Sequence, residues 1–288
     1  MRIMTEILKS APVVSHFTQL LESQTNELKK QGVTPSMKVF LVGEHPPSMI
    51  YTRNKKRFIE KFGGDCEIIK LPESISEKDF LNKVKSVTSD DSVHGVFIQL
   101  PVPSQLQSID IGNLIPPEKD VDGFSDKNLS ALIKGSTGED ALISCTPKGV
   151  LTLLDFYKIP LERKNIVVIG RSLIVGKPMS LLGTNRNATV TICHSKTNNL
   201  KEHTRTADII ISAVGISKFL NKDYIGTNNP VVIDVGINHD EDGKLCGDID
   251  YQDVKDLCSA ITPVPGGVGP MTILSLAQNL LQAASKSL

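Results

Sequence analysis

Seven short apolar runs recur along this chain of 288 residues, and several of them end at glycine or proline. Strands that are apolar throughout are typical of a parallel sheet covered by helices on both faces. Longer segments with helical spacing of apolar residues separate the runs, and this alternation predicts an α/β fold. The predicted strands span residues 37–43, 66–71, 95–100, 165–170, 188–193, 208–214 and 231–237.

Helices are predicted between these runs, and the turn-rich segment 118–147 divides the chain into two parts. One helix begins near Ser48 and ends at Gly63-Gly64, and Ser76 caps the next. A chain of this length is long enough for two domains. We therefore expect one domain over residues 1–146, a second with a parallel sheet over 147–271, and a C-terminal helix (272–288) that packs back onto the first.

Charge and cysteine content argue against several classes of protein. Lysine plus arginine equals aspartate plus glutamate at 32 each, so nothing in the net charge predicts nucleic acid or an anionic membrane as partner. The five cysteines are scattered without a CxxC pair, and the six histidines lie singly, so we expect reduced thiols and no metal site. No signal-peptide core or membrane-spanning run is found, which predicts a cytoplasmic protein.

The turn from Gly170 to Gly176 follows an apolar run and precedes a predicted helix. Backbone N–H groups in such a turn, together with the helix N-terminus, bind the pyrophosphate of a dinucleotide. The middle glycine of G-x-G-x-x-G is absent, so a simple strand-to-helix connection is an alternative. The three predicted strands that follow favour a dinucleotide-binding domain.

The residues after the next predicted strand indicate which dinucleotide is bound. An NAD site usually carries an aspartate or glutamate there, which binds the ribose 2′-OH. This chain instead has Cys193-His194-Ser195-Lys196-Thr197, with Arg171 in the preceding turn. Arginine and serine bind a 2′-phosphate, which a carboxylate would repel. NADP is therefore favoured over NAD, and the alternative is that Arg171 and Lys196 are solvated surface residues.

A second candidate site lies in the first half of the chain. Ser48, Tyr51 and Lys55 fall on neighbouring turns of one predicted helix face, where the tyrosine would stack on a substrate beside a proton-transferring lysine. Gln99 lies in an apolar run, where its amide requires a hydrogen-bond partner. The alternatives are a solvated surface lysine and a purely structural amide.

Asp120 and Asp122 occur in the turn sequence KDVDGF at residues 119–124. A carboxylate there would match the adjacent N–H donors of a 2-amino-4-oxo-pyrimidine ring. The alternative is an ordinary turn aspartate.

Seven segments in the same order give the chain a specific resemblance to a known family. They are PPSMIYTRNKK, GVFIQLPVP, PPEKDVDGF, SCTPKGV, GRSLIVGKPMS, VVIDVGIN and ITPVPGGVGPMT. The chain resembles the methylenetetrahydrofolate dehydrogenase/cyclohydrolases from about residue 42 to 280. The resemblance implies an NADP-dependent homodimer with a folate-binding first domain and a Rossmann-type second domain. It further implies oxidation of 5,10-methylenetetrahydrofolate and hydrolysis of the methenyl product to 10-formyltetrahydrofolate.

The same resemblance assigns roles to individual residues. It makes Lys55 the catalytic lysine, Tyr51 the tyrosine beside the substrate, Gln99 the partner of the lysine, and Asp122 the pterin-binding aspartate. Substrate contacts are also implied for Pro101, Pro265 and Gly266. Cofactor contacts are implied for Thr146, Gly170, Arg171, Ser172, Val175, Gly176, His194, Ser195, Ala213, Val214, Gly215, Ile237 and Thr272.

The chain departs from the family pattern in two places. Residues 125–130 replace the common His-x-x-Asn-x-Gly, and Ser144 replaces a common proline. Two other functions stay open: a shikimate-type dehydrogenase, and a folate- or nucleotide-binding protein that has lost catalysis. A dehydrogenase without cyclohydrolase activity is a third alternative.

Overall fold

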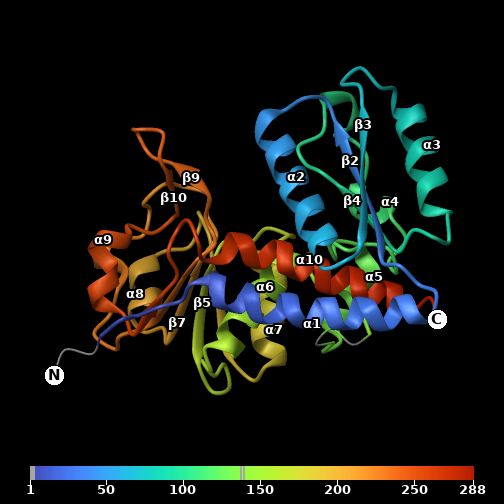
Figure 1. Cartoon of the computed structure of the whole chain (residues 1–288). Coiled ribbons are helices and arrows are strands. Elements are labelled where there is room, and N and C mark those ends of the chain that lie inside the picture. The colour runs from blue at the N-terminus through green and yellow to red at the C-terminus, as the bar shows by residue number, and fades with distance from the viewer. Residues whose placement is uncertain (1–3, 137, 139) are drawn as a thin grey trace. The chain divides into compact units, whose positions relative to one another are not determined.

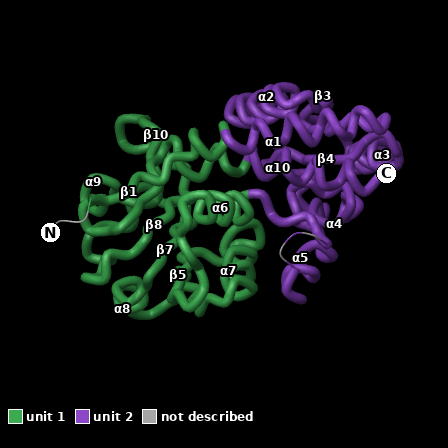
Figure 2. The backbone as a smooth tube through the Cα atoms, turned by 60° about the horizontal axis from the view of Figure 1, so that its bottom comes forward, with its two compact units in different colours: residues 1–15, 146–272 green, residues 16–145, 273–288 purple. Residues whose placement is uncertain are grey.

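The computed structural model describes residues 4–136, 138 and 140–288, which fall into two compact units. Unit 1 is formed by the described residues of Met1–Ser15 and Thr146–Thr272, and unit 2 by those of His16–Cys145 and Ile273–Leu288 (Figure 2). Two long helices, α1 (Ser10–Lys30) and α10 (Val268–Ser285), contribute residues to both units (Figure 1).

Unit 1 contains a six-stranded sheet in the order β1-β11-β8-β7-β5-β6, in which every pairing is parallel. Its central strands consist of buried aliphatic residues, such as Val167, which pairs with Ile210 on one side and Thr191 on the other. The strands are β1 (Glu6–Ile7), β5 (Asn165–Ile169), β6 (Thr189–Cys193), β7 (Ile209–Ser212), β8 (Val231–Asp234) and β11 (Ala260–Ile261).

The chain steps from β5 outward to β6 and then returns to the other side of β5 as β7. Such a reversal in an open parallel sheet leaves a crevice at the carboxyl ends of the two central strands. The remaining elements of unit 1 are α6 (Cys145–Phe156), α7 (Gly176–Asn185), α8 (Leu200–Arg205), α9 (Tyr251–Val254) and an antiparallel pair, β9 (Asn238–His239) with β10 (Leu245–Cys246).

Unit 2 contains a three-stranded parallel sheet in the order β3-β2-β4. Phe40 on its central strand meets Phe80 edge to face, with ring centroids 6.2 Å apart, and both rings are fully buried. The elements are β2 (Ser36–Val42), α2 (Pro46–Lys61), β3 (Asp65–Leu71), α3 (Glu77–Thr88), β4 (Gly95–Ile98), α4 (Ile111–Leu114) and α5 (Asp126–Ile133).

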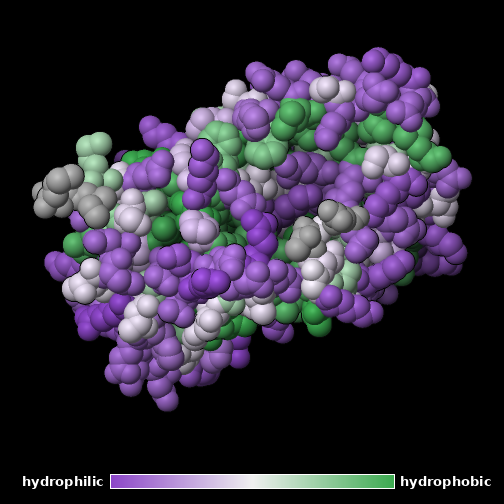
Figure 3. Space-filling view, turned by 90° about the horizontal axis from the view of Figure 1, so that it is seen from below, coloured by the Kyte–Doolittle hydropathy of each residue, from purple (hydrophilic) through white to green (hydrophobic). Residues whose placement is uncertain are grey.

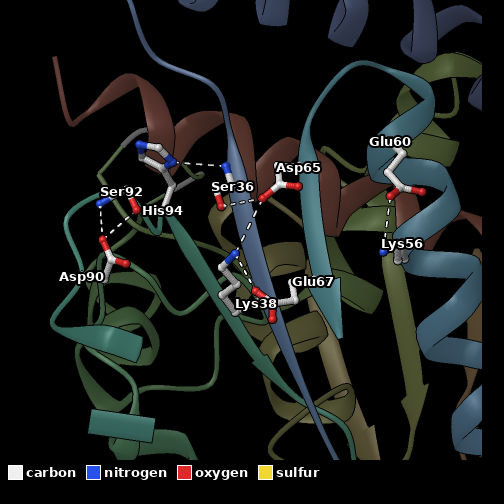
Figure 4. Close-up of polar contacts among 9 residues, drawn as sticks. All are labelled: Ser36, Lys38, Lys56, Glu60, Asp65, Glu67, Asp90, Ser92 and His94. Atoms are coloured by element: carbon white, nitrogen blue, oxygen red, sulfur yellow. Dashed lines mark hydrogen bonds and ion pairs between the residues drawn. The ribbon is translucent and has the colours of Figure 1, made fainter. Parts of the chain in front are cut away.

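Polar contacts hold the start of the central strand in unit 2 (Figure 4). The backbone N–H of Ser36 donates to Nδ1 of His94 at 3.2 Å, and Lys38 pairs with Glu67 at 2.9 Å. Because β2 begins at Ser36, these contacts fix the amino end of the sheet. The candidate site described below lies at the opposite, carboxyl end.

The α/β class with a parallel central sheet is confirmed, and all seven predicted strands are present to within two residues at their N-terminal ends. Four two-residue strands were not predicted, because two residues are too short to show a periodic pattern. Helices α1, α4, α5, α8 and α9 were not predicted either. The structure also differs at the N-terminus: residues 4–15 belong to unit 1, because Glu6 and Ile7 pair with Ala260 and Ile261 of β11.

The surface shown in Figure 3 is mainly hydrophilic, with smaller groups of hydrophobic side chains. Within the described part of the chain, no helix combines the length and apolar character that crossing a membrane requires.

Candidate active site

Helix α2 carries a lysine on its buried face. Ser48, Thr52, Lys55 and Ile59 recur at helical spacing, and all four are buried. The Lys55 side chain is only 8% exposed, whereas Lys56, the next residue, lies at the surface and pairs with Glu60 at 3.5 Å (Figure 4). The solvated-lysine alternative is therefore wrong for Lys55.

Lys55 reaches a polar and aromatic environment. Its Nζ donates to Oε1 of Gln99 at 2.9 Å and lies 3.5 Å from the centre of the Phe97 ring. Burial lowers the pKa of Lys55 to about 8, against the opposing charge of Asp122. A lysine with this pKa exchanges a proton near neutral pH, as a general acid or base must.

Gln99 directly follows β4 and is held through both its backbone and its side-chain amide. Its backbone N–H donates to the Phe40 carbonyl at 2.9 Å, and its Nε2 donates to the Leu100 carbonyl at 2.7 Å. The amide oxygen is thereby directed to Lys55. The next peptide bond, Leu100–Pro101, is cis, and both of its residues are exposed.

Asp122 lies in the loop that runs beside β4, where Val96 donates its N–H to the Lys119 carbonyl at 2.8 Å. Desolvation raises the pKa of Asp122 to about 7, while the nearby Lys55 charge opposes the rise. The Cys145 thiol lies within hydrogen-bonding reach of this carboxyl and of the Val121 carbonyl, 3.2 Å away. Lys55, Gln99 and Asp122 therefore converge within unit 2.

Asp120 and Asn128 are buried residues that shape this loop. The alternative of a turn aspartate describes Asp120, whereas Asn128 was not predicted. The Asp120 carboxylate accepts hydrogen bonds from the N–H groups of Gly123 and Ser125 and from the Asn128 amide, at 2.7–3.1 Å. Asn128 also donates to the Pro117 carbonyl at 3.0 Å. Asp120 thus serves the loop itself, and Asp122 is the member of the pair that faces Lys55.

The segment that departs from the family pattern has a structural role. Ser125 caps helix α5 by accepting a hydrogen bond from the Asn128 N–H, and Ser144 donates to the Gly123 carbonyl at 3.0 Å. Both substitutions therefore leave the loop hydrogen-bonded. Tyr51 lies on α2 one turn before Lys55 and is 41% exposed, as a ring that stacks on a ligand would be.

In unit 1, the turn between β5 and α7 has the close packing of a dinucleotide site. A Cβ at Gly176 would overlap the Gly170 carbonyl, so the two ends of the turn approach more closely than other residues permit. The Ser172 hydroxyl accepts hydrogen bonds from the N–H groups of Val175 (3.1 Å) and Gly176 (3.4 Å). Arg171 and Ser172 are exposed at the start of this turn.

The other predicted cofactor residues follow the carboxyl ends of β6, β7 and β8. The turn after β6 is fixed because the Lys196 N–H donates to Nδ1 of His194 at 3.1 Å and the His194 N–H donates to Thr197 Oγ1 at 2.8 Å. Ser195, which lies between them, is exposed. The remaining residues of this group are Ala213, Val214 and Gly215 after β7 and the exposed Ile237 after β8.

Two buried carboxylates accept hydrogen bonds from these last loops, and no sequence pattern predicted either of them. Asp234 ends β8 and is 3% exposed, and Asp248 is fully buried. Burial raises the pKa of Asp234 to about 7, although hydrogen bonds from the N–H groups of Asp248 and Ile249 oppose the rise.

The last predicted residues also lie in unit 1. Thr146 and Thr272 share a hydrogen bond between their hydroxyl groups at 3.1 Å. The Val264–Pro265 peptide bond is cis, and the Gly266 carbonyl accepts hydrogen bonds from Ser10 N and Oγ at 2.8 Å each. The substrate role of Pro265 and Gly266 stays a prediction. Among the described residues, no group of three or more His, Cys, Asp or Glu side chains is arranged to hold a metal ion.

These features define a class of protein: an α/β enzyme with a nucleotide-binding parallel sheet and a separate unit that carries a buried lysine. Comparison with protein families makes the class specific. Residues 8–122 match the model of the tetrahydrofolate dehydrogenase/cyclohydrolase catalytic domain, and residues 144–288 match that of the family's NAD(P)-binding domain. The chain belongs to the tetrahydrofolate dehydrogenase/cyclohydrolase family.

Individual relatives agree with this assignment. The chain is 46% identical to the "Bifunctional protein FolD" of Oceanobacillus iheyensis over 281 residues, which are 98% of this chain and 97% of the relative. It resembles the solved FolD dehydrogenase/cyclohydrolase of Campylobacter jejuni with a TM-score of 0.95 and 39% identity, covering 99% and 100% of the two chains. The FolD of Trypanosoma brucei, solved with NADP and an inhibitor, gives a TM-score of 0.91 at 28% identity, covering 98% of each chain.

Proposed function

We propose that this chain oxidises 5,10-methylenetetrahydrofolate with NADP⁺ and hydrolyses the 5,10-methenyl product to 10-formyltetrahydrofolate. The single observation that carries the proposal is the buried Lys55, whose Nζ lies 2.9 Å from Gln99 Oε1. The family assignment supports both reactions, and it excludes the shikimate-type alternative.

The oxidation requires alignment of the donor carbon with the nicotinamide more than it requires acid–base chemistry. The carbon that loses a hydride lies between two nitrogens, which share the resulting positive charge, so no base has to act at that carbon. A bound nicotinamide would supply the acceptor for this hydride. The chain therefore has to hold the pterin, for which Asp122 and Tyr51 are the proposed contacts. It also has to fix the loops after β7 and β8, which are the proposed contacts of the cofactor.

The hydrolysis does require proton transfer. Water adds to the methenyl carbon and loses a proton, which leaves a neutral hydroxyl adduct. The bond from that carbon to N5 then breaks, as N5 gains a proton and the hydroxyl loses its own to become the formyl oxygen. Neutral Lys55 would accept the first proton, and the adjacent substrate cation would disfavour its charged form further. Gln99 orients the amine without adding a charge that would keep it protonated.

NADP is proposed over NAD because Arg171 and Ser195 are exposed at the ends of β5 and β6, with no carboxylate at the end of β6. The decisive assay mixes the purified protein with methylenetetrahydrofolate and either NADP⁺ or NAD⁺, and follows reduced cofactor and methenyl product together. Reduction with NADP⁺ and little methenyl accumulation is expected. Faster reduction with NAD⁺ would contradict the cofactor choice, and no reduction with either would favour a binding protein without catalysis.

A homodimer in the cytoplasm is the proposed state of the protein. Support comes from the family resemblance and from the five free cysteines. Sedimentation equilibrium should give twice the chain mass of 31.3 kDa, and a single-chain mass would contradict the dimer.

A further inference from the structure

The carboxylate pair formed by Asp234 and Asp248 joins loops that are distant in sequence. One oxygen of Asp248 accepts hydrogen bonds from Val214 N at 2.7 Å and Ser212 Oγ at 3.3 Å. The other accepts from Ile216 N at 3.1 Å and Asn238 Nδ2 at 2.9 Å. A single buried side chain thus holds the loop after β7 and the start of β9.

Asp234, the second member of the pair, accepts hydrogen bonds from a further set of backbone groups. Its carboxylate accepts hydrogen bonds from the N–H groups of Gly236 (3.0 Å), Asp248 (2.9 Å) and Ile249 (3.0 Å). Its own N–H donates to Thr262 Oγ1 at 2.7 Å. Seven donors therefore converge on two carboxylates, and three of them come from residues 214–236.

The backbone is shaped to admit these side chains. A Cβ at Gly236 would overlap the Asp248 carboxylate, and a Cβ at Gly247 would overlap that of Asp234. Each glycine therefore permits a close approach that no other residue would. Burying two carboxylates side by side is unfavourable unless their hydrogen bonds are complete, and here the seven donors provide those bonds.

We propose that Asp248 and Asp234 are positioning residues that hold the loops after β7 and β8 in the conformation that receives the nicotinamide end of the cofactor. The inference rests on the proposed function, because it takes Val214, Gly215 and Ile237 as cofactor contacts. Neither carboxylate touches the cofactor. Both act through backbone N–H groups that the loops would otherwise expose to water.

The test variant is Asp248→Asn, in which an NH₂ group replaces one accepting oxygen. Asp208→Asn is the matched control, since Asp208 Oδ2 accepts the Asn165 N–H at 2.8 Å at the opposite, amino edge of the same sheet. Three properties are measured: the Kd for NADP⁺ by titration calorimetry, amide hydrogen exchange of the cofactor-free protein, and cyclohydrolase turnover of methenyltetrahydrofolate.

For Asp248→Asn we expect a Kd for NADP⁺ raised about tenfold, because one or two loop hydrogen bonds are lost. Amide exchange at Val214 and Ile216 should be faster, and cyclohydrolase turnover should stay within about twofold of the parent. Asp208→Asn should bind NADP⁺ as the parent does. Unchanged NADP⁺ affinity in Asp248→Asn, or an equal loss in Asp208→Asn, would overturn the inference.

If Asp248→Asn does not fold, Ser212→Ala takes its place, because it removes one donor to Asp248 at a fully buried position. Faster exchange at Val214 and a measurably raised Kd are then expected, and parental values for both would overturn the inference. Hydrogen exchange requires no cofactor. A parent protein that does not bind NADP⁺ would therefore contradict the proposed function, while the exchange rates would still decide whether the pair holds the loops.

Discussion

Lys55 and Lys56 are neighbours on helix α2, and only the first is buried. Their difference arises from the rotation of the helix: Lys55 falls on the stripe with Thr52 and Ile59, and Lys56 falls outside it. Residue type alone predicts a surface position for both lysines, because burial depends on how the helix packs. Helical spacing made Lys55 a candidate beside Tyr51, and the family resemblance favoured that role over a solvated lysine.

The same limit applies to the aspartates. Asp120 and Asp122 could both be proposed from their turn, and the family pattern favoured Asp122, whereas Asp234 and Asp248 could not be proposed. Their roles consist of hydrogen bonds to backbone groups, some of them on distant segments, such as the bond from Val214 to Asp248 across 34 positions. No short motif encodes such contacts, so they become visible only in the folded chain.

Gln99→Glu tests whether the neutral form of Lys55 does the chemistry. In the parent, cyclohydrolase kcat/KM should rise with pH through about 8, because deprotonation of Lys55 supplies the base. A carboxylate 2.9 Å from Nζ favours the ammonium form, so the rise should move upward by about 1 pH unit or more. The measurement is a pH–rate profile between pH 6 and 9.5, corrected for uncatalysed hydrolysis.

Gln105→Glu is the control for this experiment, because Gln105 is an exposed residue of the same unit that donates to the Glu73 carbonyl. Its profile should match that of the parent. A flat parental profile, or a downward shift in Gln99→Glu, would mean that Lys55 is not the base.

At the scale of secondary-structure elements, the long apolar strands could be predicted because each carries its own signal. The two-residue strands could not: β1 and β11 pair across more than 250 positions, and their residues show no alternation. The predicted C-terminal helix is present as α10, and its residues 273–285 belong to unit 2. Its polar contact with the active-site loop was not predicted.

That contact is made by Asn279, which is fully buried on α10. Its Nδ2 donates to the carbonyl groups of Val121 and Ile143 at 2.8 Å each. Asn279→Ala should lower the free energy of unfolding by about 2 kcal/mol, because two buried carbonyl groups lose a donor. Cyclohydrolase turnover should fall as well, since Val121 adjoins Asp122.

Unfolding in urea and the cyclohydrolase assay measure these effects. Ser285→Ala, at an exposed position near the end of the same helix, is the control and should behave as the parent. Equal unfolding midpoints for the two variants would show that Asn279 does not stabilise the loop.

At the scale of the whole molecule, the two proposed reactions depend on different units. The residues proposed for hydrolysis, Lys55, Gln99 and Asp122, all lie in unit 2, whereas the cofactor loops lie in unit 1. Oxidation requires residues of both units, whereas the proton transfers of hydrolysis require only Lys55, Gln99 and Asp122 in unit 2. Substitutions should therefore separate the two activities according to the unit in which they fall.

The most direct test of this account compares Lys55→Met with Lys56→Met in both assays and in folate binding. Lys55→Met should lose about 10²- to 10⁴-fold in cyclohydrolase turnover, the usual contribution of a general base, while it still binds folate and reduces NADP⁺. Lys56→Met should keep both activities, because its side chain pairs only with Glu60 at the surface. Retained cyclohydrolase turnover in Lys55→Met would contradict the central claim.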